Sequence, residues 1–173
     1  MLPADLFVQV LAVMYPTKNS LPEKVRIQIS GMLQDHLANS IDLVSHAKQA
    51  HWNVKGPGFV ALHQLFDEVA EHSEAYVDLI AERIVQLGGI AEGTLKSASK
   101  RSQLPDYSVS LAAGHQHIHA LSYSLASYGE SVRGAIGLAD ELSDRDTADI
   151  LTQISREVDK YLWFVEAHTQ SGA

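Results

Sequence analysis

Residues 59–87 read FVALHQLFDEVAEHSEAYVDLIAERIVQL, and this stretch does most to decide the fold. Apolar residues recur along it every three or four positions, which is the period of an α-helix with one buried face. The apolar positions are Leu62, Phe66, Val69, Tyr76, Ile80, Ile84 and Leu87. Gly88 and Gly89 follow, and glycine most easily adopts the left-handed conformation that ends a helix. The pattern predicts a long amphipathic helix.

A second row of side chains on this predicted helix carries negative charge. Plotted at about 3.6 residues per turn, one imidazole and five carboxylates share an arc of about 100°. They belong to His63, Asp67, Glu71, Glu74, Asp78 and Glu82. Like charges three or four residues apart oppose helix formation by roughly 0.2–0.5 kcal/mol a pair, so the row is unfavourable unless a cation lies on it. A bound metal ion would explain the row, and a solvated helix face is the alternative.

Length and composition indicate one globular domain. The chain has 173 residues, of which 46% are hydrophobic and 20% charged, and we assign residues 1–173 to a single domain. Residues 1–20 form an N-terminal extension in which a short helix is one option. The apolar run at residues 6–14 follows Asp5 rather than a basic segment, and no stretch approaches the roughly 20 apolar residues that cross a bilayer. We therefore expect no signal peptide, no membrane span and a cytoplasmic location.

The lack of cysteine and the acidic charge limit the chemistry. With no cysteine, the chain offers nitrogen and oxygen ligands to a metal, and neither disulfides nor thiolate catalysis. A formal net charge of −8 opposes unaided binding of nucleic acid, because phosphates must be neutralised by lysine or arginine. Small cations are the favoured partners.

Turn signals divide the chain into four amphipathic segments and predict an all-α fold. The segments are residues 20–53, 59–87, 108–142 and 143–165. Ser20 is positioned to cap the first helix, and Gly56-Pro57-Gly58 forces a turn after it. Residues 90–107 contain glycine and proline and predict a long connection that could carry one short helix. This order predicts a four-helix bundle with a long connection between helices two and three, which is the ferritin-like topology.

The acidic row faces away from the predicted bundle core, since its centre lies about 140° from that of the apolar row. Di-iron carboxylate bundles instead point their ligands inward and carry a Glu-x-x-His motif on each of two helices. No histidine of this chain has an acidic residue three positions before it. The sequence therefore does not encode an intrabundle di-iron centre.

The potential metal ligands of the second helix form two clusters at its two ends. His63 and Asp67 lie near the start and Asp78 and Glu82 near the end, so the cluster centres are about 22 Å apart. One chain cannot close both clusters around a metal ion, whereas an antiparallel pair of chains on a two-fold axis brings each cluster to the partner's complementary one. His51, at the end of helix one, can join His63 across a short turn. Such ligands suit iron(II), zinc or manganese, among which ligand type does not choose.

A set of longer motifs spans most of residues 20–168. They read His51-Trp52-Asn53-Val54-Lys55-Gly56-Pro57-Gly58-Phe59, Leu62-His63, Phe66-Asp67, Asp78, Ala81-Glu82-Arg83, Asp146-Thr147-Ala148-Asp149, Ile154-Ser155-Arg156, Asp159-Lys160 and Leu162-Trp163-Phe164. In residue type and spacing they resemble the signature of the Dps family, the small ferritin-like proteins of bacteria. The resemblance implies a homo-dodecameric shell with ferroxidase centres at its two-fold interfaces.

The resemblance also assigns roles to residues. His51, His63 and Asp67 would come from one subunit and Asp78 and Glu82 from its partner, together holding two iron ions per centre. Iron(II) would be oxidised there, preferentially by hydrogen peroxide, and stored inside the shell as a ferric mineral. A centre that prefers zinc and oxidises iron poorly is a further option.

Trp52 and four aspartates carry alternative interpretations. Trp52 matches a family tryptophan that would donate an electron near the centre, and the alternative is a core aromatic closing the helical hairpin. The family's three-fold pores are lined by aspartates near the start of the fourth helix. The candidates are Asp149 first, then Asp140, Asp144 and Asp146. Helix capping is the competing explanation for Asp144 and Asp146.

The other histidines and the chain ends suggest no further site. We expect His36 and His168 to be hydrogen-bonded core or interface residues, and we assign no role to His72, opposite the acidic row. His115, His117 and His119 cannot converge on a helix, where positions two apart point about 200° apart. DNA binding by a basic tail is doubtful because residues 1–20 offer only Lys18 and no base follows Lys160. A DNA-coating shell with vestigial metal sites is the rival function.

Overall fold

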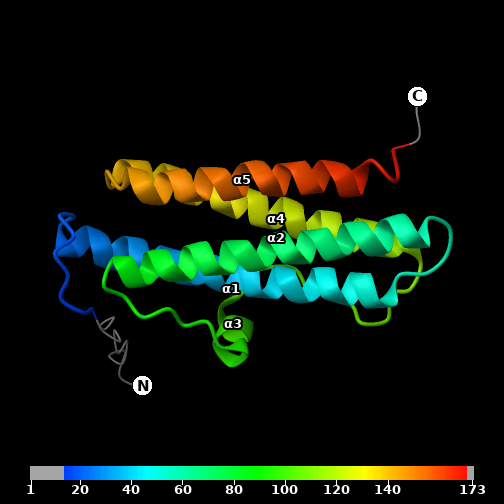
Figure 1. Ribbon diagram of the computed structural model, residues 1–173, viewed down its shortest axis with the longest axis horizontal. Coiled ribbons are helices and arrows are strands. Elements are labelled where there is room, and N and C mark those ends of the chain that lie inside the picture. Colours follow the sequence, from blue (N-terminus) through cyan, green and yellow to red (C-terminus); the bar gives the residue numbers. More distant parts are fainter. Residues whose placement is uncertain (1–13, 171–173) are drawn as a thin grey trace, which may run out of the picture.

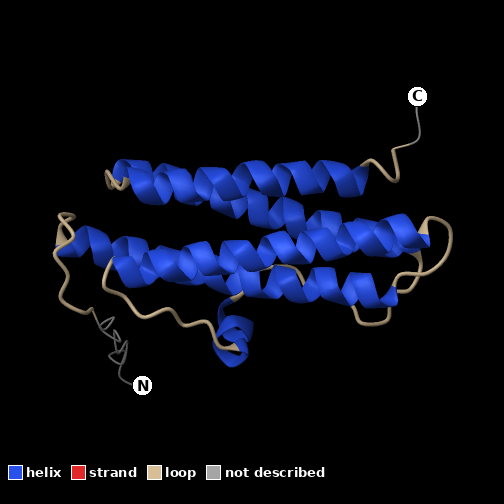
Figure 2. Cartoon of the chain, viewed as in Figure 1, coloured by secondary structure: helices blue, strands red, loops and turns tan. Residues whose placement is uncertain are grey.

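The computed structural model describes residues 14–170, and within this part the chain forms five α-helices and no strand (Figures 1 and 2). The helices are α1 (Glu23–Asn53), α2 (Phe59–Gln86), α3 (Leu95–Arg101), α4 (Gly114–Glu141) and α5 (Arg145–Glu166). Residues 14–20 are not helical, and the rest of the N-terminal extension lies outside the described residues. None of the helices described is long and apolar enough to cross a membrane.

The four long helices form two antiparallel pairs packed into one bundle. The helix α1 packs along α2 and α4 along α5, while the short helix α3 lies on α1 (Figure 1). The long connection between α2 and α4 contains α3. The predicted all-α four-helix bundle and its long connection are therefore confirmed.

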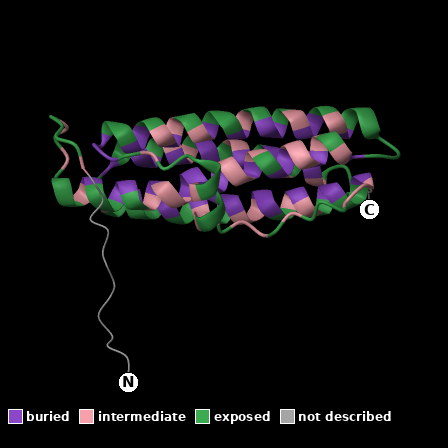
Figure 3. Cartoon of the chain, turned by 90° about the horizontal axis from the view of Figure 1, so that it is seen from below, coloured by how far each residue is buried: buried purple, intermediate pink, exposed green. Residues whose placement is uncertain are grey.

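Apolar burial on the facing sides of the helices stabilises this arrangement (Figure 3). Leu33 of α1, Phe66 of α2, Leu121 of α4 and Val158 of α5 are completely buried. Burial of each such side chain contributes about 1.5–3 kcal/mol relative to exposure. The apolar row predicted on α2 is buried in full, which leaves the acidic row of the same helix outside the bundle.

The start of α4 differs from the prediction. Residues 108–113 are not helical, because they pair with the segment after α1: the Lys55 N–H donates to the Ala112 carbonyl over 2.8 Å, and the Gly114 N–H donates to the Lys55 carbonyl over 3.1 Å. Gly114 allows a close approach here, since a Cβ at this position would lie 2.7 Å from a methyl group of Leu62 and that side chain would have to move. This pairing holds the α1–α2 turn against the start of α4.

The start of α1 also differs from the prediction. Pro22, rather than Ser20, occupies the cap position of α1, and no side chain caps this helix end. The helix begins only at Glu23.

Candidate metal centre

His51 and His63 face each other across the turn between α1 and α2. Their rings stack with centroids 3.7 Å apart. The Nδ1 of His51 lies 2.7 Å from the His63 carbonyl, and the Nδ1 of His63 lies 2.8 Å from the His51 carbonyl. A carbonyl oxygen can only accept, so each Nδ1 carries the proton and each Nε2 of the neutral rings keeps a free lone pair. This is the hydrogen-bonding arrangement that prepares an imidazole to bind a metal through Nε2.

The turn that brings the two imidazoles together depends on glycine. Gly56 and Gly58 have φ values of 99° and 75°, which L side chains rarely adopt. Gly58 is the cap residue of α2, so its backbone sets the direction in which α2 leaves the turn. The local sequence therefore fixes the approach of His63 to His51.

Asp67 lies one helical turn beyond His63, where it is paired with a lysine. Its carboxylate forms an ion pair with the Lys48 ammonium and lies 3.8 Å from the Nδ1 of His51. The hydrogen bond from Lys48 lowers the pKa of Asp67, and the hydrogen bond to Asp67 raises the pKa of Lys48. Asp67 is therefore ionised at neutral pH, and a bound cation would have to compete with the ammonium of Lys48.

Asp78 and Glu82, at the other end of α2, are exposed and make no ion pair within residues 14–170. Among the described residues, no three histidine, aspartate or glutamate side chains are placed to hold a metal ion together. One chain thus presents two incomplete ligand sets, two imidazoles with a carboxylate at one end and two carboxylates at the other. Val85, between the second set and the end of α2, is 58% exposed although apolar.

Trp52 does not close the hairpin as a core aromatic, so that interpretation was wrong. Its side chain is 69% exposed. It lines a surface cavity of about 780 Å³ together with Lys48 of α1 and Glu74 of α2. The electron-donor role remains a proposal.

Of the four pore candidates, Asp144 is excluded by its surroundings. It is 2% exposed, pairs with Arg83 over 2.7 Å and caps α5 by accepting from the Thr147 backbone N–H. The capping explanation therefore holds for Asp144. Asp140, Asp146 and Asp149 are exposed and stay candidates.

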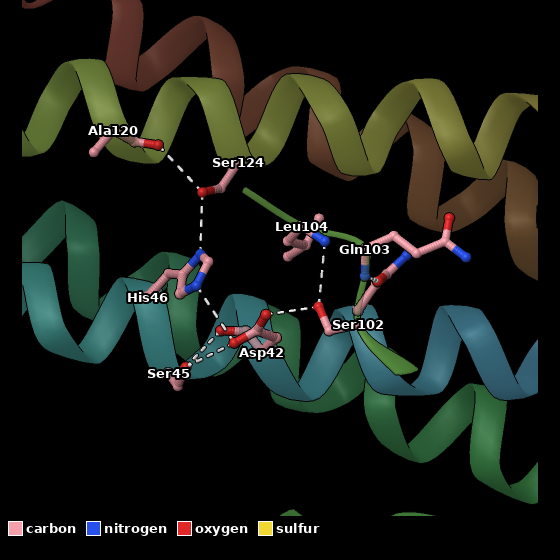
Figure 4. Close-up of polar contacts among 9 residues, drawn as sticks. Asp42, Ser45, His46, Ser102, Gln103, Leu104, Ala120 and Ser124 are labelled. Atoms are coloured by element: carbon pink, nitrogen blue, oxygen red, sulfur yellow. Dashed lines mark hydrogen bonds and ion pairs between the residues drawn. The ribbon is translucent and has the colours of Figure 1, made fainter. Parts of the chain in front are cut away.

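Two other histidines, His46 and His117, lie inside the bundle, and no sequence pattern predicts their partners. The Nδ1 of His46 lies 3.1 Å from the Ser124 hydroxyl, and its Nε2 lies 3.4 Å from Asp42 (Figure 4). Asp42 also accepts from the Ser102 hydroxyl over 2.6 Å, which ties the α2–α4 connection to α1. His117 bonds the Tyr107 hydroxyl over 2.8 Å.

Of the remaining five histidines, four lie at or near the surface and His36 is buried. The Nδ1 of His72 is 3.4 Å from Glu157, and that of His168 is 2.8 Å from the Phe164 carbonyl. His115 and His119 are exposed while His117 between them is buried, as the helical period requires. His36 is 4% exposed, as expected for a core residue, but its Nδ1 has no hydrogen-bond partner among the described residues.

Comparison with known proteins gives consistent results. Residues 31–172 match the ferritin-like domain family. The chain is 44% identical to the DNA protection during starvation protein of Agrobacterium fabrum over 90% of this chain and 96% of the relative. The protein of the same name from Mycolicibacterium smegmatis is 34% identical, with 87% and 82% of the chains covered.

Solved structures agree with these matches. A Mycobacterium smegmatis Dps superposes with a TM-score of 0.86 at 33% identity, covering 91% of this chain and 96% of the other. DpsA14 from Streptomyces coelicolor superposes with a TM-score of 0.88 at 31% identity, covering 93% and 95%.

Proposed function

Because the chain belongs to the ferritin-like Dps family, we propose that it is a ferroxidase that oxidises iron(II) and stores the ferric product inside a shell of twelve subunits. The imidazole pair at His51 and His63 carries this proposal. Both rings are already fixed in the tautomer that leaves Nε2 free, and Asp67 is ionised beside them. The two imidazoles need little reorganisation to accept a divalent cation, whereas the cation has to displace the Lys48 ammonium from Asp67.

The second half of the centre would come from another copy of the chain. An antiparallel copy on a two-fold axis would place its Asp78 and Glu82 beside His63 and Asp67, and symmetry would generate two such centres per pair. The exposed Val85 and Trp52 flank these ligands and would be covered by the same contact. Three carboxylates of the row, Asp67, Asp78 and Glu82, would then face iron rather than water, which lowers the cost of the row to the helix.

Oxidation of iron(II) at this centre can be written as a balanced reaction with hydrogen peroxide. Each of two iron(II) ions loses one electron, the peroxide O–O bond breaks on receiving both electrons, and two protons complete two water molecules. The carboxylates favour this direction because anionic oxygen ligands stabilise iron(III) more than iron(II). Trp52 would supply an electron when only one iron ion is bound, and Asp140, Asp146 and Asp149 would attract cations at the pores. The ligand set also accommodates zinc as a competing ion.

Complementation between two defective variants tests the shared centre. One variant carries His51→Ala and His63→Ala, and the other carries Asp78→Ala and Glu82→Ala. Each alone should lose rapid oxidation of iron(II) by peroxide in stopped-flow absorbance. Mixed subunits, dissociated and reassembled in equal amounts, should recover about one quarter of the parent rate, since half of the pairs are mixed and each mixed pair has one intact centre.

A single control variant isolates the effect of the assigned carboxylates. Glu71→Ala, from the same exposed row but outside the assigned ligands, should retain the parent rate. Recovery in the mixture below a few per cent of the parent rate would overturn the shared centre. Native mass spectrometry of particles reassembled with one variant labelled with ¹⁵N confirms that both variants entered the same shell.

The relatives' name, DNA protection during starvation protein, favours a second candidate function, a shell that coats DNA. In this chain the cationic residue Arg101 of α3 is already paired with Asp35 over 3.0 Å and lies 3.4 Å from Glu92. That leaves Lys96 and Lys100 as the cations of α3 for phosphate contact. We expect no gel shift of duplex DNA at low salt without magnesium, and a clear shift in plain buffer would favour DNA coating.

A further inference from the structure

The first two turns of α4 hold a pair of imidazoles that the metal centre does not use. His115 and His119 are four residues apart on α4, so their side chains are neighbours on one face with Cβ atoms about 5–6 Å apart. Both are exposed. His117, on the other side of the helix, is buried and bonded to Tyr107. The helix thus separates one structural histidine from two that face solvent.

Neither exposed imidazole is engaged by the rest of the described chain. Within residues 14–170, the side chains of His115 and His119 form no hydrogen bond and no ion pair. His72 and His168, in contrast, each have a partner, Glu157 and the Phe164 carbonyl. The ring nitrogens of the α4 pair are therefore available to a ligand from solution.

Both imidazoles open into one surface cavity whose charge suits a cation. The cavity has a volume of about 720 Å³ and lies between the start of α4 and the end of α5. Asp106 and Glu166 line it together with His115 and His119, and no lysine or arginine does. Two carboxylates in a hollow without opposing cations raise the local concentration of positive ions.

We propose that His115 and His119 form a second cation site, which binds a divalent ion of the zinc and copper class through both imidazoles. Two histidines four residues apart on one helical face are a recurring metal-binding arrangement. Imidazole suits copper(II), nickel and zinc, and affinity for nitrogen ligands rises from iron(II) towards copper(II). The site thus differs in preference from the carboxylate-rich centre of α2, which suits iron.

The proposed site has two protein ligands, and water completes the coordination. This agrees with the finding that no three histidine or acidic side chains of the described residues converge on one point. Asp106 and Glu166 act through their charge across the cavity. The proposal does not depend on iron oxidation by the chain.

Copper(II) titration of the full chain tests the site, with Cu²⁺ alone as the probe. The double variant His115→Gln plus His119→Gln should bind about one Cu²⁺ fewer per chain than the parent. Each single variant should bind that ion at least about tenfold more weakly, because even loss of an outer partner of a ligand costs 10–100-fold in affinity. The matched control, His72→Gln plus His168→Gln, removes two other surface histidines and should keep the parent stoichiometry.

Two spectroscopic and structural measurements locate the bound ion. The parent should show an electron paramagnetic resonance component with two nitrogen ligands that is lost in the double variant. Crystals of the parent soaked in Zn²⁺ should show an anomalous peak between the two imidazoles. Equal ion counts in parent and double variant, or one single variant binding as tightly as the parent, would overturn the proposal.

Discussion

The histidines inside the bundle and those at the α1–α2 turn are the same residue type in opposite surroundings. Both ring nitrogens of His46 have partners, Ser124 and Asp42, whereas His117 bonds Tyr107 through Nδ1 and its buried Nε2 has no partner within residues 14–170. His51 and His63 each give one nitrogen to a backbone carbonyl and keep the other free. A free Nε2 is therefore not enough to suggest a metal site: that of His117 is buried alone, whereas the stacked rings of His51 and His63 lie together at the turn, where we propose that a metal binds.

The polar residues around His46 form a network inside the bundle. Hydrogen bonds among His46, Ser124, Asp42 and Ser102 join α1, α4 and the long connection (Figure 4). Burial raises the pKa of Asp42, but hydrogen bonds from His46 and Ser102 outweigh it, and the net result is a lowered pKa. The interior polar groups therefore stabilise the packing of the helices, and the site that we propose lies elsewhere, on the outer face of α2.

Protonation of the buried His36 provides the largest expected effect on stability. Burial lowers its pKa from 6.5 to about 4, although Asp35 acts in the opposite direction. Between these pH values the unfolded chain binds a proton that the folded protein does not, so the free energy of unfolding decreases as the pH falls. The difference of about 2.5 pH units amounts to about 3 kcal/mol. Urea unfolding at one protein concentration from pH 7 to pH 4 measures this loss.

Substitution of His36 identifies its share of the pH dependence. His36→Leu should flatten the decrease between pH 6.5 and pH 4, since leucine does not titrate. The matched variant His72→Leu changes an exposed histidine and should retain the parent slope. An unchanged slope in His36→Leu would show that other groups cause the acid sensitivity.

Removal of His46 tests whether the polar network inside the bundle affects stability without affecting the metal centre. His46→Ala leaves Asp42 and Ser124 without a shared partner and removes a ring that packs 5.0 Å from Tyr107. We expect a loss of about 1–3 kcal/mol in the free energy of unfolding, with iron(II) oxidation unchanged after refolding. Ser45→Ala, which removes an exposed hydroxyl bonded to Asp42, should cost less than about 0.5 kcal/mol. Similar losses in both variants would contradict the interior role of His46.

Removal of Lys48 tests how its ammonium affects cation binding at His51, His63 and Asp67. It has the smallest expected effect of the variants. Lys48→Met frees the Asp67 carboxylate from its ammonium partner, and exposed ion pairs of this kind contribute about 0.2–1 kcal/mol. Cation affinity at the His51 and His63 centre should rise by up to about fivefold in equilibrium titration with iron(II) under anaerobic conditions. Lys24→Met makes the same charge change at the far end of α1 and should leave affinity unaltered. Weaker binding in Lys48→Met would mean that Lys48 positions Asp67 for the metal.

Helix periodicity predicted the bundle and the outward acidic face because both depend on positions near each other in sequence. The apolar row of α2 is buried in full, and the long connection carries the short helix α3. The prediction was wrong where distant segments meet: residues 108–113 carry a helical apolar pattern but pair with Lys55 instead. For Asp144 the sequence left capping and a pore role open, and its contacts with Thr147 and Arg83 select capping.

The sequence by itself determined that the chain is a helical bundle with its potential ligands split between the two ends of α2. Helix geometry requires this split, since 1.5 Å per residue keeps the two clusters about 22 Å apart. Only the tertiary structure decided that His51 and His63 stack with Nε2 free. It also decided that Lys48 pairs with Asp67 and that His46 is hydrogen-bonded inside the bundle. These contacts join residues on different helices, and the packing of those helices, rather than local spacing, sets which side chains meet.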